Sequence, residues 1–413
     1  MTTFKKILAN WIIMLCLAAS ASGQWRGPAR DGHFPSESLL KAWPEGGPEL
    51  VYKVTDIGEG YSSPVVHQGS IYVTGKIDSM DVLSALTMTG EIKWQVPYGY
   101  SWQQSYTSTR SSPSMEESRA YLLSGLGELV CIDIETQAVI WSRQVDKTYG
   151  AVWDTHGVSE TLLVVDDMVV CSPAGKQTSM VAFNKYTGEP VWQTPPVGGN
   201  RSYASPVLYE YNGIRQILGA TTWSYYAVDP ASGKIMWTFP YHVLGERNTD
   251  RGTLVTFTPI FRDNEIFITS GYDYPAILLS NAEDGRSVSE KWRCPEFDTH
   301  HGHVVRIGDY LYGSNWISNS QGQWMCVDWN TGEIKWTKKW FNKGSIITAD
   351  GMIYLYEEKR GHVGLLQPDP DRFHLVSSFR IEEGAGPHWA HPVIHGHQLM
   401  IRHGDHLMVY DLK

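Results

Sequence analysis

Basic residues are scarce in this sequence of 413 residues, because 34 Lys and Arg stand against 44 Asp and Glu and give a formal net charge of −10. No run of Lys or Arg forms a basic patch, which argues against nucleic acid as a partner. Charged residues of both signs make up only 19% of the chain, and aromatic residues make up 12%. This composition excludes a disordered chain and a coiled coil.

Cysteines and long apolar runs are also few. Five cysteines in a chain of this length do not form a disulfide framework, and no two of them are adjacent. Beyond residue 23, no apolar stretch reaches the roughly 20 residues that a bilayer-spanning helix needs. We therefore expect no membrane span.

The N-terminal segment has the layout of a secretory signal. Lys5 and Lys6 precede a mostly apolar stretch over residues 7–19, and small residues follow it up to residue 23. This predicts a signal peptide over residues 1–23, cleaved before Gln24, and a periplasmic or extracellular protein. A lipoprotein anchored at Cys16 is the alternative, which we disfavour because Leu15 precedes this cysteine inside the apolar run.

A turn pattern, Thr-Gly-x-x-x-Trp, recurs along the chain. It occurs at residues 89–94, 187–192 and 331–336, with variants at 136–141, 232–237 and 284–292. An Asp or Asn lies three residues before several of these turns, where its side chain can cap the turn, and Gly tolerates a positive φ. Short runs rich in Val, Ile, Tyr and Leu precede each turn, which is typical of β-strands.

Four short strands repeated about every 45 residues predict an all-β fold, a β-propeller of four-stranded antiparallel blades. We count eight units, and a ring of seven blades with one degenerate segment is the alternative. The last unit lacks its outer strand, which residues 48–54 can supply with Tyr52 in the Trp position. The predicted organisation is a lead over residues 24–47 and one propeller domain over residues 48–413.

The blade assignment also bears on redox state. It distributes Cys131, Cys171, Cys294 and Cys326 over four different blades. A disulfide requires Cα atoms roughly 4.4–6.8 Å apart. We therefore expect four unpaired thiols after cleavage of the signal peptide.

The repeated Asp-x-x-Thr-Gly-x-x-x-Trp turn resembles the PQQ-type propeller repeat of quinoprotein alcohol dehydrogenases and of BamB, the outer-membrane barrel-assembly factor. The lead over residues 25–32 is similar to the opening of exported bacterial PQQ-binding-like propellers, as are residues 300–302 and 388–392. This resemblance implies the fold more strongly than an activity, because function on a shared fold depends on the site.

The resemblance also implies what a quinone site requires. The dehydrogenases place a vicinal Cys-Cys pair against PQQ and hold a calcium ion with a Glu, an Asn and an Asp. This sequence has no adjacent cysteines, and we can place no matching set of calcium ligands. We therefore expect no bound PQQ and no PQQ-dependent dehydrogenase activity.

The candidate site lies on the face with long links between blades, because the turns on the other face are tight and loops on a rigid scaffold usually carry function. The residues just before each inner strand should surround the mouth of the central channel. We take four of them as tentative catalytic groups: Arg110, His301, Lys343 and His391. The expected ligand-binding residues are Tyr61, Trp153, Tyr203, His300, His388 and Trp389.

Cations, imidazoles and aromatic rings together suit an anionic or sugar-like ligand, because Arg can bind a carboxylate with two hydrogen bonds. A nearby cation should also keep an imidazole neutral, as a general base requires. His301 and His303 should share one face of a strand, with His300 on the other. We predict no metal site. The alternative interpretation is that these groups pair with carboxylates such as Glu160 or Glu358 and only join blades.

Two functions follow from the sequence. The first is an exported, monomeric propeller that binds a small anionic or carbohydrate ligand, or a cell-envelope protein, at the channel mouth. The second is an enzyme that acts there on a sugar or uronate by acid–base chemistry, or as a quinoprotein-type oxidoreductase.

Overall fold

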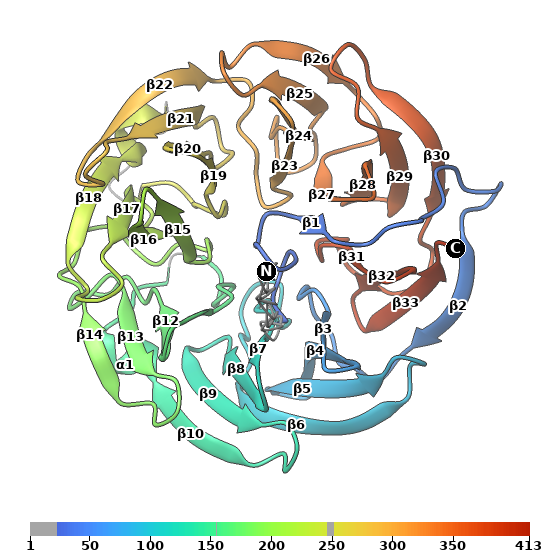
Figure 1. The fold of residues 1–413 in the computed structure, drawn as a ribbon. Helices are drawn as coiled ribbons and strands as arrows, with labels where there is room; N and C mark the ends of the chain where they lie inside the picture. The colour runs from blue at the N-terminus through green and yellow to red at the C-terminus, as the bar shows by residue number, and fades with distance from the viewer. Residues whose placement is uncertain (1–22, 154, 246–251) are drawn as a thin grey trace, which may run out of the picture.

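The computed structural model describes residues 23–153, 155–245 and 252–413. Nearly all of the predicted signal peptide, with Cys16, lies outside these residues. The described residues form eight antiparallel sheets arranged as a ring of blades (Figure 1), so the eight-bladed prediction is confirmed and the seven-bladed alternative is wrong. None of the helices in these ranges is long and apolar enough to cross a membrane.

Each blade runs from an inner strand at the channel to an outer strand at the rim. The strands of blades one to four are β3 (Val65–His67), β4 (Ser70–Ile77), β5 (Met80–Thr87), β6 (Ile92–Tyr100), β7 (Ser114–Glu116), β8 (Arg119–Leu123), β9 (Glu128–Asp133), β10 (Val139–Gln144), β11 (Leu163–Val165), β12 (Met168–Cys171), β13 (Val181–Asn184), β14 (Pro190–Gln193), β15 (Val207–Tyr211), β16 (Ile214–Ala220), β17 (Ser224–Val228) and β18 (Ile235–Pro240).

Blades five to eight follow in the same order. Their strands are β19 (Ile260–Arg262), β20 (Glu265–Ile268), β21 (Ala276–Asn281), β22 (Val288–Cys294), β23 (Val304–Ile307), β24 (Tyr310–Ser314), β25 (Trp324–Asp328), β26 (Ile334–Lys338), β27 (Gly344–Ala349), β28 (Met352–Glu357), β29 (His362–Gln367), β30 (His374–Arg380), β31 (Val393–His395), β32 (Gln398–His403), β33 (His406–Asp411) and β2 (Glu49–Val54). The lead contributes β1 (His33–Phe34), and two links contain the short helices α1 (Val145–Tyr149) and η1 (Tyr241–Leu244).

The core lies between adjacent blades, because successive residues of a strand point to opposite faces and both faces of each blade are covered. In β9, Val130 and Ile132 pack with residues of the preceding blade. Leu129 and Cys131 of the same strand pack with residues of the following blade. The four cysteines in the described residues are buried and free, as the blade assignment predicted.

The repeated turn explains how one blade docks on the next. The Oδ1 atom of Asp328 accepts hydrogen bonds from the backbone N–H groups of Asn330 and Thr331, at 2.8 and 2.9 Å. The turn glycine, Gly332, has a φ of +75°, and a Cβ there would lie 2.7 Å from the ring of Trp292 in the preceding blade. That Trp donates its indole N–H to the carbonyl oxygen of Trp329 at 2.7 Å. The Asp, Gly and Trp of the motif thus form one interface between blades.

The ring closes through β2, which pairs antiparallel with β33 as the sequence predicted. Tyr52 takes the place of the motif Trp, since its hydroxyl donates to the carbonyl oxygen of Met88 at 2.9 Å, in the turn of blade one. This pairing covers the sheet edge that β33 would otherwise expose. Figure 1 shows β2 at the rim beside the C-terminus.

The lead enters the central channel, which the sequence did not reveal. Gly23 bridges to Met115 of β7, and β1 pairs parallel with the inner strand β27. Between them, the buried Arg26 donates to the carbonyl oxygens of Val304 and Ile346, at 2.8 and 3.2 Å, in blades six and seven. Arg30 donates to carbonyl oxygens at the inner strands of blades three and four, those of Thr161, Leu162 and Pro206. Residues 23–32, which we call the plug, therefore tie blades together from inside the channel.

Candidate functional site

A cavity of about 430 Å³ opens at the channel mouth on the face with the long links. The links between blades and the turns between second and third strands supply its wall, and the plug supplies Trp25. The lining residues are Trp25, Tyr61, Tyr106, Arg110, His156, Ser159, Thr161, Tyr203, Ser205, Leu254, Thr256, Tyr272, His300, His301, His303, Asn319, Ser320, Lys343, Glu358, Lys359, Trp389 and His391.

Most of the candidate residues from the sequence come together here. Eight line the cavity: Tyr61, Arg110, Tyr203, His300, His301, Lys343, Trp389 and His391. Trp153 and His388 do not line it. The indole N–H of Trp153 bonds to the buried carboxylate of Asp146. His388 is buried against Tyr356, whose hydroxyl lies 2.6 Å from its Nδ1, and stacks on His403.

Arg110 forms one side of the cavity. Its Nη2 donates to the carbonyl oxygens of Ser105 and Tyr106, at 2.7 and 2.5 Å, which holds the guanidinium in place. Its Nη1 is buried and has no hydrogen-bond partner among the described residues. No carboxylate of the described ranges lies in ion-pair distance of Arg110. Burial lowers the pKa of Arg110 from its usual value.

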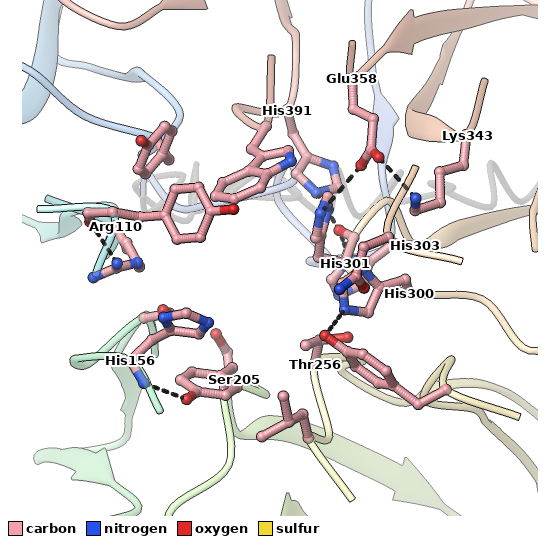
Figure 2. Close-up of a pocket in the computed structure, with 18 of the residues that line it drawn as sticks. Arg110, His156, Ser205, Thr256, His300, His301, His303, Lys343, Glu358 and His391 are labelled. Atoms are coloured by element: carbon pink, nitrogen blue, oxygen red, sulfur yellow. Dashed lines mark hydrogen bonds and ion pairs between the residues drawn. The ribbon is translucent and has the colours of Figure 1, made fainter. Parts of the chain in front are cut away.

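Glu358, Lys343 and His301 form the opposite side (Figure 2). The Nζ of Lys343 lies 2.8 Å from Oε1 of Glu358, and Nε2 of His301 lies 3.3 Å from Oε2. Oε2 nevertheless makes no hydrogen bond within the protein. Burial raises the pKa of Glu358, and the charge of Lys343 opposes that shift. Glu358 therefore pairs with a candidate cation, as the alternative interpretation from the sequence expected. Glu160 instead pairs with Arg201, which is not a candidate residue.

His391 and His303 are held by both ring nitrogens. Arg26 donates to Nδ1 of His391 at 3.0 Å, so the proton of this ring is on Nε2, which donates to the carbonyl oxygen of His301 at 3.0 Å. The backbone N–H of Thr258 donates to Nε2 of His303, and Nδ1 donates to the same carbonyl oxygen at 2.8 Å. Neither ring has a free nitrogen for a ligand. Both position the backbone of His301.

The expected alternation of His300, His301 and His303 is wrong, because these residues lie in a turn before β23 rather than in the strand. All three line the cavity, and His303 has a φ of +62°. Burial, followed by the charge of Lys343, lowers the pKa of His301 to about 3. Burial also lowers the pKa of His300 well below its usual value. Desolvation therefore favours the neutral form of both imidazoles, although the side chain of His301 is 26% exposed.

Two further lining residues, His300 and Thr256, carry polar atoms without a partner among the described residues. Nε2 of His300 lies 3.0 Å from the hydroxyl of Tyr272, but Nδ1 is buried without a partner, as is Oγ1 of Thr256. Thr256 carried no signal in the sequence, because nothing in its link distinguishes it from neighbouring residues. Trp25 belongs to the conspicuous lead, but only the tertiary structure places it edge-on to His303 and His391, with ring centroids at 5.0 and 5.4 Å.

Comparison with known proteins identifies the fold family. The sequence profile described as "Outer membrane protein assembly factor BamB" matches residues 78–338, more than half of the chain. The chain belongs to this BamB family. No curated protein matches the sequence at a significant level.

Solved structures agree with the BamB-family fold. BamB from Moraxella catarrhalis superposes with a TM-score of 0.64 at 17% identity, covering 88% of this chain and 99% of that one. The quinohemoprotein alcohol dehydrogenase of Comamonas testosteroni superposes at 0.62 with 11% identity, covering 93% and 79%. A europium-containing methanol dehydrogenase superposes at 0.52 with 11% identity, covering 91% and 88%. At these identities the likeness concerns the fold alone.

The dehydrogenases raise the question of whether a quinone and its calcium ion fit the cavity of this BamB-family chain. Calcium requires several oxygen ligands, carboxylates above all. Among the described lining residues Glu358 is the one carboxylate, and Lys343 already holds one of its oxygens. No group of three or more His, Cys, Asp and Glu side chains in the described ranges is arranged to hold a metal ion. The residues present do not fit the group, and we derive no redox step.

Proposed function

We propose that this protein is an exported binding module that takes up a small anionic ligand at the mouth of its channel. The observation that carries the proposal is Arg110, whose guanidinium lines the cavity without a carboxylate partner and with Nη1 unpaired. A buried, unpaired hydrogen-bond donor costs stability unless a ligand or water satisfies it. A carboxylate or phosphate is the natural partner of such a guanidinium.

Binding is better supported than acid–base catalysis. Both nitrogens of His391 are engaged, and the pKa of His301 is about 3. A general base works best when its pKa lies near the working pH. Binding of an anion by the Arg110 guanidinium between aromatic rings does not require a pKa near the working pH.

Thermal unfolding in the presence of organic anions tests the proposal. We expect at least one of malate, citrate, D-glucuronate and glucose 6-phosphate to raise the melting temperature, and glycerol and glucose to leave it unchanged. A ligand at 100 times its Kd stabilises the native state by about 2.7 kcal/mol. Arg110→Gln should abolish the shift. Arg143→Gln is the matched control. It removes an arginine of outer strand β10 that pairs with Glu189, and this variant should retain the shift in melting temperature. No shift with any anion, or the same shift in Arg110→Gln, would overturn the proposal.

A further inference from the structure

The two sides of the cavity differ in chemistry, which restricts the ligand beyond its charge. Arg110 offers a donor on one side, and Glu358 lies on the other, beside His300 and His301 (Figure 2). Four polar atoms of residues that line the cavity are buried and have no hydrogen-bond partner among the described residues. These are Nη1 of Arg110, Oγ1 of Thr256, Nδ1 of His300 and Oε2 of Glu358.

Glu358 fixes the orientation of an anionic ligand. Its side chain is 3% exposed, and no other carboxylate lines the cavity in the described ranges. A second anionic group beside Oε2 would be repelled, because like charges interact strongly where water is excluded. Oε2, which lies 3.3 Å from Nε2 of His301, instead favours a group that donates a hydrogen bond. The other lining cations, Lys343 and Lys359, neighbour Glu358, so the anionic group is assigned to Arg110 and a donor to Glu358.

Aromatic rings form the wall between these two sides. Trp389 contacts Tyr61 and Tyr106, with ring centroids at 5.0 and 4.8 Å, and also contacts His301 at 5.3 Å. Such a wall accepts the apolar C–H face of a ring, while its edge leaves room for polar groups. A volume of about 430 Å³ lies within the usual range for small-molecule sites, roughly 300–1,000 Å³.

We infer that the ligand is a sugar acid, a mono- or disaccharide with one carboxylate. This inference rests on the proposed function and specifies its ligand class. The carboxylate binds the free side of the Arg110 guanidinium, and the sugar ring packs against Trp389. Its hydroxyls donate to Oε2 of Glu358 and bond to Oγ1 of Thr256 and Nδ1 of His300. Each unpaired atom of the cavity then has a partner.

Calorimetric titration of the mature chain tests the inference with defined probes. The sugar acids are D-glucuronate, D-galacturonate, D-mannuronate and D-gluconate. The controls are cyclohexanecarboxylate, which has the acid without hydroxyls, D-glucose, which has hydroxyls without the acid, and 6-aminohexanoate, which carries an ammonium group. We expect at least one sugar acid to bind at least 30-fold more tightly than all three controls, because a site built to hydrogen-bond hydroxyls rejects analogues that lack them.

Several outcomes would overturn the inference. If cyclohexanecarboxylate or 6-aminohexanoate binds as tightly as the sugar acids, the ligand class is wrong while anion binding at Arg110 stands. If none of the four sugar acids binds but malate, citrate or glucose 6-phosphate does, the class is again wrong and the proposed function survives. If no anion binds at all, the proposed function fails as well.

Two variants separate the hydroxyl contacts from the carboxylate contact. Glu358→Gln should weaken the binding of the best sugar acid at least tenfold and leave cyclohexanecarboxylate within twofold. Glu357→Gln is the matched control, because this neighbouring carboxylate is also buried but does not line the cavity, and it accepts hydrogen bonds from the backbone N–H groups of Lys359 and Arg360. Thr256→Val removes one hydroxyl at nearly constant volume and serves if Glu358→Gln does not fold. Unchanged sugar-acid binding in Thr256→Val, or in a folded Glu358→Gln, would overturn the inference.

Discussion

Arg26 of the plug and His391 before the inner strand of blade eight lie 3.0 Å apart, from Nη1 to Nδ1. Burial lowers the pKa of Arg26 to about 10, so its guanidinium remains charged at neutral pH and must donate this bond. His391 is thereby fixed with its proton on Nε2, which donates to the carbonyl oxygen of His301. A residue near the N-terminus thus sets the protonation of a residue 365 positions later.

Replacing Arg26 should affect both stability and this tautomer. Arg26→Met keeps the bulk of the side chain but leaves the carbonyl oxygens of Val304 and Ile346 without a donor. Hydrogen bonds from a charged group are worth about 1.5–3 kcal/mol each, so we expect a loss of at least about 3 kcal/mol in unfolding free energy. Urea unfolding measures the loss, and ¹⁵N shifts of His391 should change from one tautomer to a mixture. An unchanged ring spectrum would contradict the role of Arg26.

Ring closure can be tested with two truncations. Removing residues 24–32 deletes the part of the plug that follows the predicted cleavage site, whereas removing residues 24–54 also deletes β2 and exposes the edge of β33. Uncovered strand edges pair with other chains. The longer truncation should therefore aggregate at lower temperature than the shorter one, as light scattering during heating would show. Equal behaviour of the two proteins would mean that β2 contributes little to closure.

The acid sensitivity of the fold should depend on His388. Burial, followed by the nearby His403, lowers the pKa of His388 to about 3, from 6.5 in the unfolded chain. The unfolded state then binds the extra proton between pH 6.5 and 3, so the contribution of His388 to stability is complete above pH 6.5 and falls as the pH drops. Each pH unit in this window removes about 1.4 kcal/mol.

His388→Gln should remove this dependence while keeping a polar group near the hydroxyl of Tyr356. We expect the difference in unfolding free energy between pH 6.5 and 5 to be about 2 kcal/mol smaller in the variant than in the parent protein. Denaturant unfolding of both proteins at several pH values measures it. Parallel pH profiles would show that His388 is protonated equally in both states.

The four cysteines of the mature chain should remain thiols. Cys131, Cys171, Cys294 and Cys326 are buried on separate blades, and burial raises the pKa of Cys131 and Cys326 to about 12. A thiol is unreactive when it is neutral and shielded from solvent. We expect no reaction with a thiol reagent in the native protein and four equivalents after denaturation without reductant. A titre of two or none would be incompatible with this arrangement.

The propeller could be predicted from the amino-acid sequence, because the repeat is a local pattern. In the full motif an Asp or Asn caps the turn, a Gly takes a positive φ, and an aromatic ring packs on the next blade, as in residues 328–336. The same pattern identified β2 through Tyr52, whose hydroxyl makes the contact that an indole N–H makes elsewhere. Chain order also indicated which residues precede the inner strands. The sequence therefore predicted that Arg110, His301 and Lys343 line one cavity.

Which of these groups lack a partner could not be predicted from the sequence. Whether a side chain faces a ligand depends on the partners that the fold brings to it from distant positions. Arg26 engages His391, Lys343 engages Glu358, and Arg110 is left with an unpaired nitrogen. The plug had no strand pattern to reveal it, because isolated backbone bridges and arginine contacts to carbonyl oxygens of four blades hold it in the channel. Local periodicity therefore specifies the blades, and long-range hydrogen bonding specifies the site.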